Sequence, residues 1–284
     1  MLFCSFTLGW CQAASPLKIT VPILATDSHN HPVSGLTPES FVISEHKKPI
    51  GDISLVRATD LPLRLGVLID TSRSERDTSL PEALQAVKNF ASSTVRSGDD
   101  RAFILTFAEE TEATAWLRKE DLPSVAINVS YGPATVLYDS IAIACQQRMS
   151  AADSDRAGRR VLVVISDGDD NKSHITIGTA ESEALMSRTT IFTIVTHASP
   201  VQRARGDRVM AELATATGGQ SFTGLYRDDM PKVFATLGEL IGGMYYASYT
   251  PPIGGTVHEV EIRPAAKQKF LISYPEKYAW LRGN

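Results

Sequence analysis

Nearly continuous runs of apolar residues recur along the middle of the chain, each about the length of a β-strand. They do not alternate with polar residues, as strands with one solvent-facing side do. Continuous apolar runs are typical of strands buried on both faces, as in a parallel sheet covered by helices. The runs are Leu65–Ile69, Ala102–Phe107, Val161–Ile165 and Ile191–Val195. Phe107 and the segment Ala113–Leu117 also allow one antiparallel hairpin at the sheet edge.

Between and after these runs, apolar residues recur at the three- and four-residue spacing of amphipathic helices. Ser79-Leu-Pro-Glu82 has the form of a capping box with proline in the first turn, and Gly218-Gly219 is a typical stop signal. The apolar stripes are Leu80/Leu84/Val87/Ala91, Leu137/Ile141/Ala144/Cys145, Val209/Met210/Leu213/Ala214 and Val233/Phe234/Leu237/Leu240/Ile241/Met244. Strands alternating with helices predict a doubly wound α/β domain with a mostly parallel sheet over residues 61–247.

The two ends of the chain have a different pattern, with short strand-like runs broken by Asn, Pro and Gly. We expect the N-terminal β segment, residues 16–60, to pair with the C-terminal β segment, residues 248–284, in one small β-module. The strand-like runs are Ile19–Leu24, Phe41–Ser44, Ile53–Arg57, Thr256–Ile262 and Lys269–Tyr274.

Residues 1–15 resemble an export signal, because a short apolar run is followed by Ala13-Ala14-Ser15, although a basic first segment is missing. They predict an exported protein, in the periplasm, at the cell surface or outside the cell. The apolar run Val233–Tyr249 is shorter than a membrane span and contains an acidic residue, so it predicts a core helix. No integral membrane span is therefore expected once the leader is removed.

Composition excludes several classes of protein. The chain has 284 residues, of which 43% are hydrophobic and 21% charged, and this is typical of a globular protein with a full core. The net charge is −4 and no basic stripe is present, so nucleic acid is not an expected partner. The three cysteines form no CxxC motif, and Cys145 falls in a helical stripe, where we expect a small buried side chain.

Polar residues follow the apolar runs at three places. Asp70, Ser72 and Ser74 come directly after the first run, Thr135 lies in a loop that opens a predicted helix, and Asp167 follows the third run. Ligands of open α/β sheets bind at the carboxyl ends of the strands, where these residues would meet. All five offer oxygen donors, which suit Mg²⁺, Mn²⁺ or Ca²⁺ better than Zn²⁺. At least one coordination position would stay open for a carboxylate from a partner.

These residues resemble the metal-ion-dependent adhesion site of von Willebrand factor A-type domains. The family pattern is Asp-x-Ser-x-Ser, then a threonine and then an aspartate on further loops. The matching residues here are Asp70, Ser72, Ser74, Thr135 and Asp167. The resemblance implies a Rossmann-like fold, a bound divalent cation, and a protein partner that supplies an Asp or Glu carboxylate. The segments PVSGLTPESFVISEHKKP, GPATVLYDSI and SDGDDN, with an aromatic tail near Tyr274–Trp280, also resemble a bacterial group of exported proteins with this domain.

Two features near the site leave alternatives open. Arg73 stands where the family commonly has glycine; its guanidinium would either favour acidic partners or block access. The run Asp167–Asn171 adds carboxylates, which form either a solvated turn or a site tuned toward Ca²⁺. Gly242-Gly243, at the end of the last predicted helix, would either act as a hinge or allow close packing.

Other functions fit the sequence less well. A haloacid dehalogenase-type phosphatase needs a second acid two residues after its nucleophilic aspartate, and Ser72 stands there. No glycine-rich nucleotide loop and no G-x-S-x-G elbow occur. His29-x-His31 lies in a turn-rich stretch and predicts a turn, not a metal site. The sequence therefore predicts a binding protein and not an enzyme, with an assembly scaffold that binds through the β-module as the second hypothesis.

Overall fold

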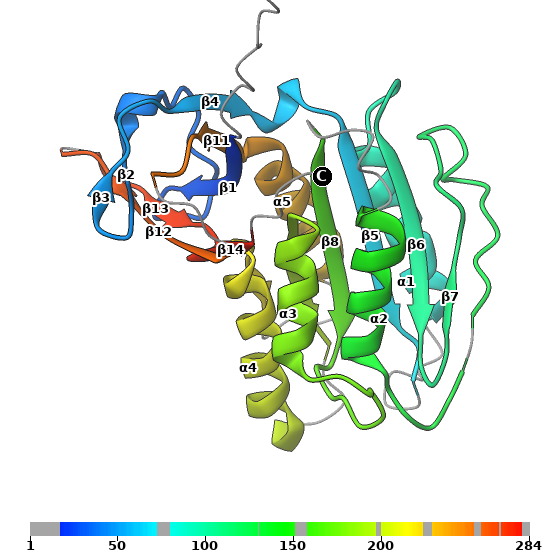
Figure 1. The fold of residues 1–284 in the computed structure, drawn as a ribbon. Helices are drawn as coiled ribbons and strands as arrows, with labels where there is room; N and C mark the ends of the chain where they lie inside the picture. Colours follow the sequence, from blue (N-terminus) through cyan, green and yellow to red (C-terminus); the bar gives the residue numbers. More distant parts are fainter. Residues whose placement is uncertain are drawn as a thin grey trace, which may run out of the picture.

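The computed structural model describes residues 18–72, 80–129, 131–150, 158–196, 200–223, 229–252, 257–266 and 268–279. They form an α/β domain with a β-module beside it (Figure 1). The predicted leader, residues 1–15, lies outside the described residues, as do Ser79 of the predicted capping box and Trp280 of the aromatic tail.

A six-stranded sheet forms the centre of the α/β domain, with the strand order β10-β9-β8-β5-β6-β7. All neighbouring strands pair in parallel except β7, which is antiparallel to β6. The predicted parallel sheet and its antiparallel edge hairpin are therefore confirmed, although the edge strand spans Thr111–Ala113 and not the expected Ala113–Leu117. The strands are β5 (Leu63–Asp70), β6 (Arg101–Phe107), β7 (Thr111–Ala113), β8 (Arg159–Ser166), β9 (Thr189–Val195) and β10 (Ser221–Phe222).

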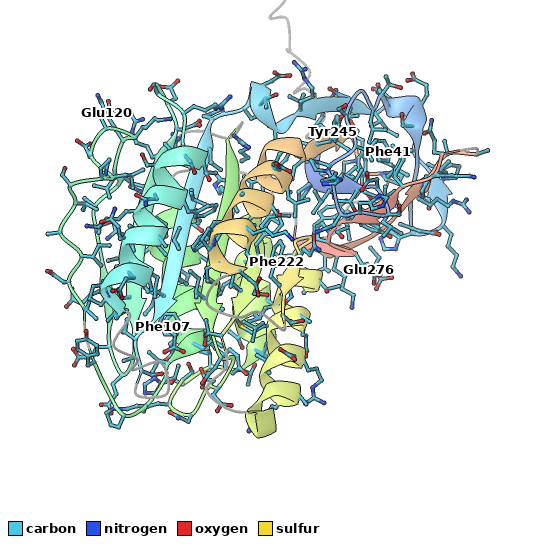
Figure 2. The ribbon with its side chains drawn as sticks, turned by 180° about the vertical axis from the view of Figure 1, so that it is seen from behind. Phe41, Phe107, Glu120, Phe222, Tyr245 and Glu276 are labelled. Atoms are coloured by element: carbon cyan, nitrogen blue, oxygen red, sulfur yellow. The ribbon has the colours of Figure 1, made fainter. Side chains whose placement is uncertain are left out.

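Helices cover both faces of this sheet. One buried cluster joins the sheet to α1 and α5, and a second joins its other face to α2, α3 and α4. Figures 1 and 2 show these two faces in turn. The helices are α1 (Leu80–Thr94), α2 (Leu137–Ile143), α3 (Ile177–Met186), α4 (Pro200–Ala216) and α5 (Met230–Gly243); α2 continues in a π-helical turn, Ala144–Met149. The doubly wound fold is confirmed, and Cys145 is buried as expected.

The sequence pattern gave no residues for α3, although the order of elements requires a helix there. Its buried positions are Ala180 and Ala184, so it presents no stripe of large apolar side chains. Thr176 caps its first turn by accepting a hydrogen bond from the backbone N–H of Thr179.

Both ends of the chain build the β-module, as expected. One sheet has the order β13-β1-β11-β4 and the other β14-β12-β2-β3. The N-terminal β1 pairs with the C-terminal β13, and β2 pairs with β12. The strands are β1 (Ile19–Thr26), β2 (Phe41–Glu45), β3 (Lys48–Pro49), β4 (Ser54–Arg57), β11 (Tyr245–Tyr249), β12 (Val257–Pro264), β13 (Leu271–Ser273) and β14 (Lys277–Ala279). Short 3-10 helices span Pro38–Ser40 and Ala58–Asp60.

The interpretation of Val233–Tyr249 as one core helix was wrong for its last five residues. The helix ends at Gly243, and Tyr245–Tyr249 form β11, which pairs with β1 and β4. A Cβ at Gly243 would overlap the side chain of Pro32, which supports close packing of this glycine. The strand buries Tyr245 and Tyr249 in the module, as Figure 2 shows for Tyr245.

The β-module lies away from the carboxyl ends of the parallel strands. In Figure 1 the arrowheads of β5, β6 and β8 point to the end of the sheet opposite the module. The turn at His29 and His31 is confirmed, because the Asp27 carboxylate accepts both of their backbone N–H groups. None of the helices in the described part of the chain is long and apolar enough to cross a membrane.

Candidate metal centre

Asp70 is the last residue of β5, the strand between β8 and β6. Its side chain is only 3% exposed. Oδ1 accepts the backbone N–H of Ser72 at 2.9 Å, and Oδ2 accepts the Ser166 hydroxyl at 2.7 Å. These hydrogen bonds hold both carboxylate oxygens at the carboxyl end of the sheet.

The environment of Asp70 disfavours its charge. Burial raises the pKa of the Asp70 carboxyl from 3.8 to about 6, against the opposing effect of hydrogen bonds from Ser72 and Ser166. The negative charge of Asp167 adds to the rise in this pKa. A cation beside the two carboxylates would remove this penalty, because it supplies the missing opposite charge.

Ser166 ends β8 and connects the two strand ends. Its hydroxyl donates to Asp70 Oδ2 and accepts the backbone N–H of Gly168 at 3.1 Å. Asp167 follows and is 3% exposed, and its Oδ1 accepts the backbone N–H of Asp169 at 3.0 Å. Sequence reasoning included Ser166 in the loop but assigned it no role; only its place beside Asp70 in the neighbouring strand marks it.

Helix α4 packs directly against the loop that carries Asp167. Gly168 has φ of +81°, a conformation that suits glycine. A Cβ at Gly168 would lie 2.7 Å from the Cα of Gly206 in α4, and a Cβ at Gly206 would overlap the carbonyl oxygen of Asp167. The two glycines therefore allow the helix and the loop to touch, and this contact fixes the position of Asp167 at the carboxyl end of β8.

Thr135 lies two residues before α2 and is 2% exposed. Its backbone N–H donates to Asn171 Oδ1 at 2.9 Å, and its carbonyl accepts the backbone N–H groups of Asn171 and Lys172. The next residue, Val136, donates to the carbonyl of Ala108, just beyond β6. The threonine loop is therefore held by the loop after β8 on one side and by the end of β6 on the other.

The acidic run after β8 has a structural role. Asp170 Oδ2 accepts the backbone N–H of Tyr138 at 3.0 Å and the hydroxyl of Ser173 at 2.6 Å. The Asp139 carboxylate in turn accepts a hydrogen bond from the backbone N–H of His174, and its Oδ2 lies 2.8 Å from the ring nitrogen Nδ1 of His174. Asp170 is half-buried at the amino end of α2, so its carboxylate holds the start of this helix while it lies in a partly exposed turn.

The structure gathers Asp70, Ser72, Thr135 and Asp167 at one end of the sheet, each no more than 3% exposed. Ser74 and Arg73 lie outside the described residues. The donors are carboxylate and hydroxyl oxygens, which fit a hard divalent cation such as Mg²⁺. The two buried carboxylates also fit a divalent cation, because a pair of buried negative charges without a balancing positive charge is costly.

The family model of the von Willebrand factor type A domain matches residues 65–232. That span contains every predicted ligand and all of the six-stranded sheet except the first two residues of β5. A comparison with curated proteins finds no match.

Several solved structures resemble this chain at low sequence identity. Proximal thread matrix protein 1 from the mussel byssus is 15% identical, over 75% of this chain and 50% of that one, with a TM-score of 0.48. This chain thus spans about half the length of the mussel protein, of which another structure has a zinc-occupied MIDAS motif. A von Willebrand factor type A protein from Catenulispora acidiphila is 12% identical, over 96% and 75% of the two chains, with a TM-score of 0.48. An aerotolerance-related membrane protein from Bacteroides fragilis is 14% identical, over 63% and 98%, with a TM-score of 0.43.

Proposed function

Since the chain belongs to the von Willebrand factor type A domain family, we propose that it binds a protein partner through a divalent cation at the carboxyl end of its parallel sheet. The proposed ligands are Asp70, Ser72, Ser74, Thr135 and Asp167. Mg²⁺ is the proposed ion, with Mn²⁺ and Ca²⁺ as substitutes of similar oxygen preference.

One observation carries the proposal: two buried carboxylates and two buried hydroxyl residues from three separate loops meet at one end of the sheet. Burial also raises the pKa of the Asp70 carboxyl to about 6. The charge is costly in the metal-free protein and would be favourable beside a cation, which supports the proposal of an ion at this site.

The bound ion would supply an electrophilic position for a carboxylate of the partner. The chain contributes the fixed side of that site: Ser72 and Ser166 orient Asp70, while Asn171 orients the loop of Thr135. We propose binding without turnover, outside the cytoplasm.

Calorimetric titration of Mg²⁺, Mn²⁺ and Ca²⁺ into metal-stripped protein tests ion binding. We expect one saturable site in the native chain and none in Asp70→Ala. Glu120→Ala is the matched control, because Glu120 is an exposed acid in the segment after β7 and is not a proposed ligand. Loss of binding in the control, or binding that survives Asp70→Ala, would contradict the ligand assignment.

Loading with Mn²⁺ tests the partner chemistry. Water-proton relaxation reports water on the ion, so a peptide that contains glutamate should reduce the relaxation enhancement, whereas its glutamine analogue should not. Equal effects of both peptides would count against carboxylate recognition and favour a scaffold that binds through the β-module. Turnover of a generic aryl phosphate with Mg²⁺ would instead favour a phosphatase.

A further inference from the structure

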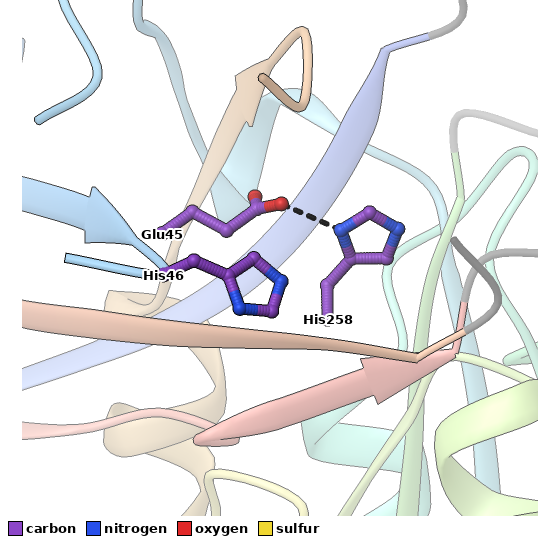
Figure 3. A group of neighbouring side chains, drawn as sticks. All are labelled: Glu45, His46 and His258. Atoms are coloured by element: carbon purple, nitrogen blue, oxygen red, sulfur yellow. Dashed lines mark hydrogen bonds and ion pairs between the residues drawn. The ribbon is translucent and has the colours of Figure 1, made fainter. Parts of the chain in front are cut away.

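A second group of chemically capable side chains lies in the β-module. Glu45 at the end of β2 and His258 in β12 are 0% and 1% exposed. They sit beside the apolar cluster of the module, which contains Ile43, Val260 and Tyr278. An ionisable carboxylate there is costly unless it is partnered, and Figure 3 shows it facing the His258 ring.

The partners of Glu45 fix its orientation. Oε1 lies 2.5 Å from His258 Nδ1, and Oε2 accepts the hydroxyl of Tyr278 at 2.7 Å. The rings of His258 and Tyr278 are stacked, with centroids 5.1 Å apart and an interplanar angle of 9°. The carboxylate and one imidazole are thus held at fixed positions by strands β2, β12 and β14.

His46 joins this pair from the turn between β2 and β3. Consecutive residues of a strand point to opposite faces, but His46 and Lys47 leave the strand with φ of +48° and +66°. The His46 N–H also donates to the carbonyl of Glu259, next to His258. As a result the rings of His46 and His258 lie with centroids 6.2 Å apart, and His46 is exposed.

One ligand atom each from Glu45, His46 and His258 lies within 4.8 Å of the others. Two imidazoles and one carboxylate are a donor set of Zn²⁺ sites that keep one position open. Bonds of about 2.0–2.2 Å to a tetrahedral ion would bring these atoms to roughly 3.3 Å from one another. The Glu45 and His258 atoms, which are 2.5 Å apart, would separate slightly to reach this distance, and rotation of the exposed His46 side chain would bring in the third ligand. Tyr278 would hold the second oxygen of Glu45, as outer partners of metal ligands commonly do.

We propose that Glu45, His46 and His258 bind one zinc ion. The ion would join the β2–β3 turn to β12, across 213 residues of chain between Glu45 and His258, and its fourth position would face solvent beside His46. Because ion binding and folding are coupled, zinc would stabilise the module. The β-module lies away from the carboxyl end of β5 (Figure 1), and the zinc site does not depend on the function proposed for Asp70.

Zinc titration of the full chain with Asp70→Ala tests the proposal, because this substitution removes the first site. Competition with a chromophoric zinc chelator in excess Mg²⁺ should show one bound Zn²⁺, since Mg²⁺ prefers oxygen ligands. His46→Asn in the same background should weaken binding at least about tenfold. Asparagine tolerates positive φ, so this variant keeps the turn. His29→Asn is the matched control, an exposed histidine of the same module outside the cluster.

His258→Gln provides a second variant, and thermal melts with and without zinc provide a second readout. Zinc should raise the melting temperature of the Asp70→Ala chain and should not raise that of the His46→Asn derivative. The absence of saturable zinc binding in the Asp70→Ala chain would overturn the proposal. So would binding that persists in both His46→Asn and His258→Gln, or that is lost in His29→Asn.

Discussion

Asp70 combines two requirements that oppose each other. It is buried at the end of the central strand, and its negative charge lies near that of Asp167. Hydrogen bonds from Ser72 and Ser166 compensate only part of the cost, so the pKa of this carboxyl stays near 6, well above 3.8. A shift of this size corresponds to about 3 kcal/mol between the charged and neutral forms. The metal-free protein is therefore less stable than it would be without this charge.

The raised pKa of Asp70 predicts that ion binding depends on pH. A cation needs the carboxylate, so Mg²⁺ affinity should be constant above about pH 6 and fall roughly tenfold per unit below it. The stability of the metal-free protein should change in the opposite direction. Since the folded pKa exceeds the unfolded one, the unfolding free energy should decrease as pH rises from about 4 to about 6. Calorimetry and urea denaturation across this range measure the two effects.

Asp70→Asn separates these effects, because an amide does not ionise. The variant should not bind Mg²⁺, and its metal-free form should be more stable than the native chain by about 1–3 kcal/mol at neutral pH. Asp121→Asn, at an exposed aspartate, is the control and should keep the native pH dependence. A Mg²⁺ affinity of the native chain that stays the same down to about pH 5 would contradict the combination of a pKa near 6 and metal binding at Asp70.

At the scale of elements, two of the loops that carry proposed ligands are positioned by contacts with neighbouring segments. The loop of Asp167 rests on α4 through Gly168 and Gly206. The loop of Thr135 is held by Asn171 from the segment between β8 and α3. Close packing against α4 thus fixes the loop of Asp167, and hydrogen bonds from the segment after β8 fix the loop of Thr135.

Gly206→Ala in α4 should shift the Asp167 loop, because the new Cβ would overlap the carbonyl oxygen of Asp167. We expect a loss of about 1–3 kcal/mol in stability and about a tenfold loss of Mg²⁺ affinity. Gly242→Ala in α5 is the control, since a Cβ there meets nothing within 4 Å. Urea denaturation measures the stability of both variants, and calorimetry measures their Mg²⁺ affinity. Equal, small effects of the two substitutions would mean that α4 does not set the position of Asp167.

At the scale of the whole molecule, strands of the β-module come both before and after the α/β domain in the chain. The chain passes through β1, β2 and β4 before the domain, and α5 then leads directly into β11. Because β11 pairs with both β1 and β4, the module is completed only after the α/β domain has been traversed. The apolar clusters also meet, since Leu24 and Tyr246 of the module belong to the cluster under α1 and α5.

A chain ending at Gly243 should therefore retain the α/β domain and lose the order of its N-terminal segment. Strands β1, β2 and β4 would lack β11–β14, and isolated strands are marginally stable in water. Limited proteolysis should remove this segment rapidly and leave a protected fragment that begins near Leu63, while the full chain stays intact. Protection of residues 18–57 in the shortened chain would contradict the interdependence of the two ends.

Local residue patterns were sufficient to predict the α/β domain and the residues that match the metal-site pattern of the family. A strand buried on both faces needs a continuous apolar run, as in Val161–Ile165, and a helix needs a regular stripe, as in α1. The proposed ligands Asp70 and Asp167 stand at the ends of β5 and β8, so they were visible in the sequence as polar residues at the ends of apolar runs. The pairing of the two ends was predicted as well, because both ends have the same pattern of short strand-like runs.

Other features depend on contacts between segments that are distant in the chain, and these features became visible in the folded structure alone. The run Val233–Tyr249 is apolar throughout and fits a helix or a strand, and pairing of its last five residues with β1 and β4 selected the strand. Ser166 gained a role because parallel pairing of β5 and β8 places it beside Asp70. Glu45 and His258 are 213 residues apart and become neighbours because β2 pairs with β12. Such proximity is a property of strand register, and no local pattern of residues encodes it.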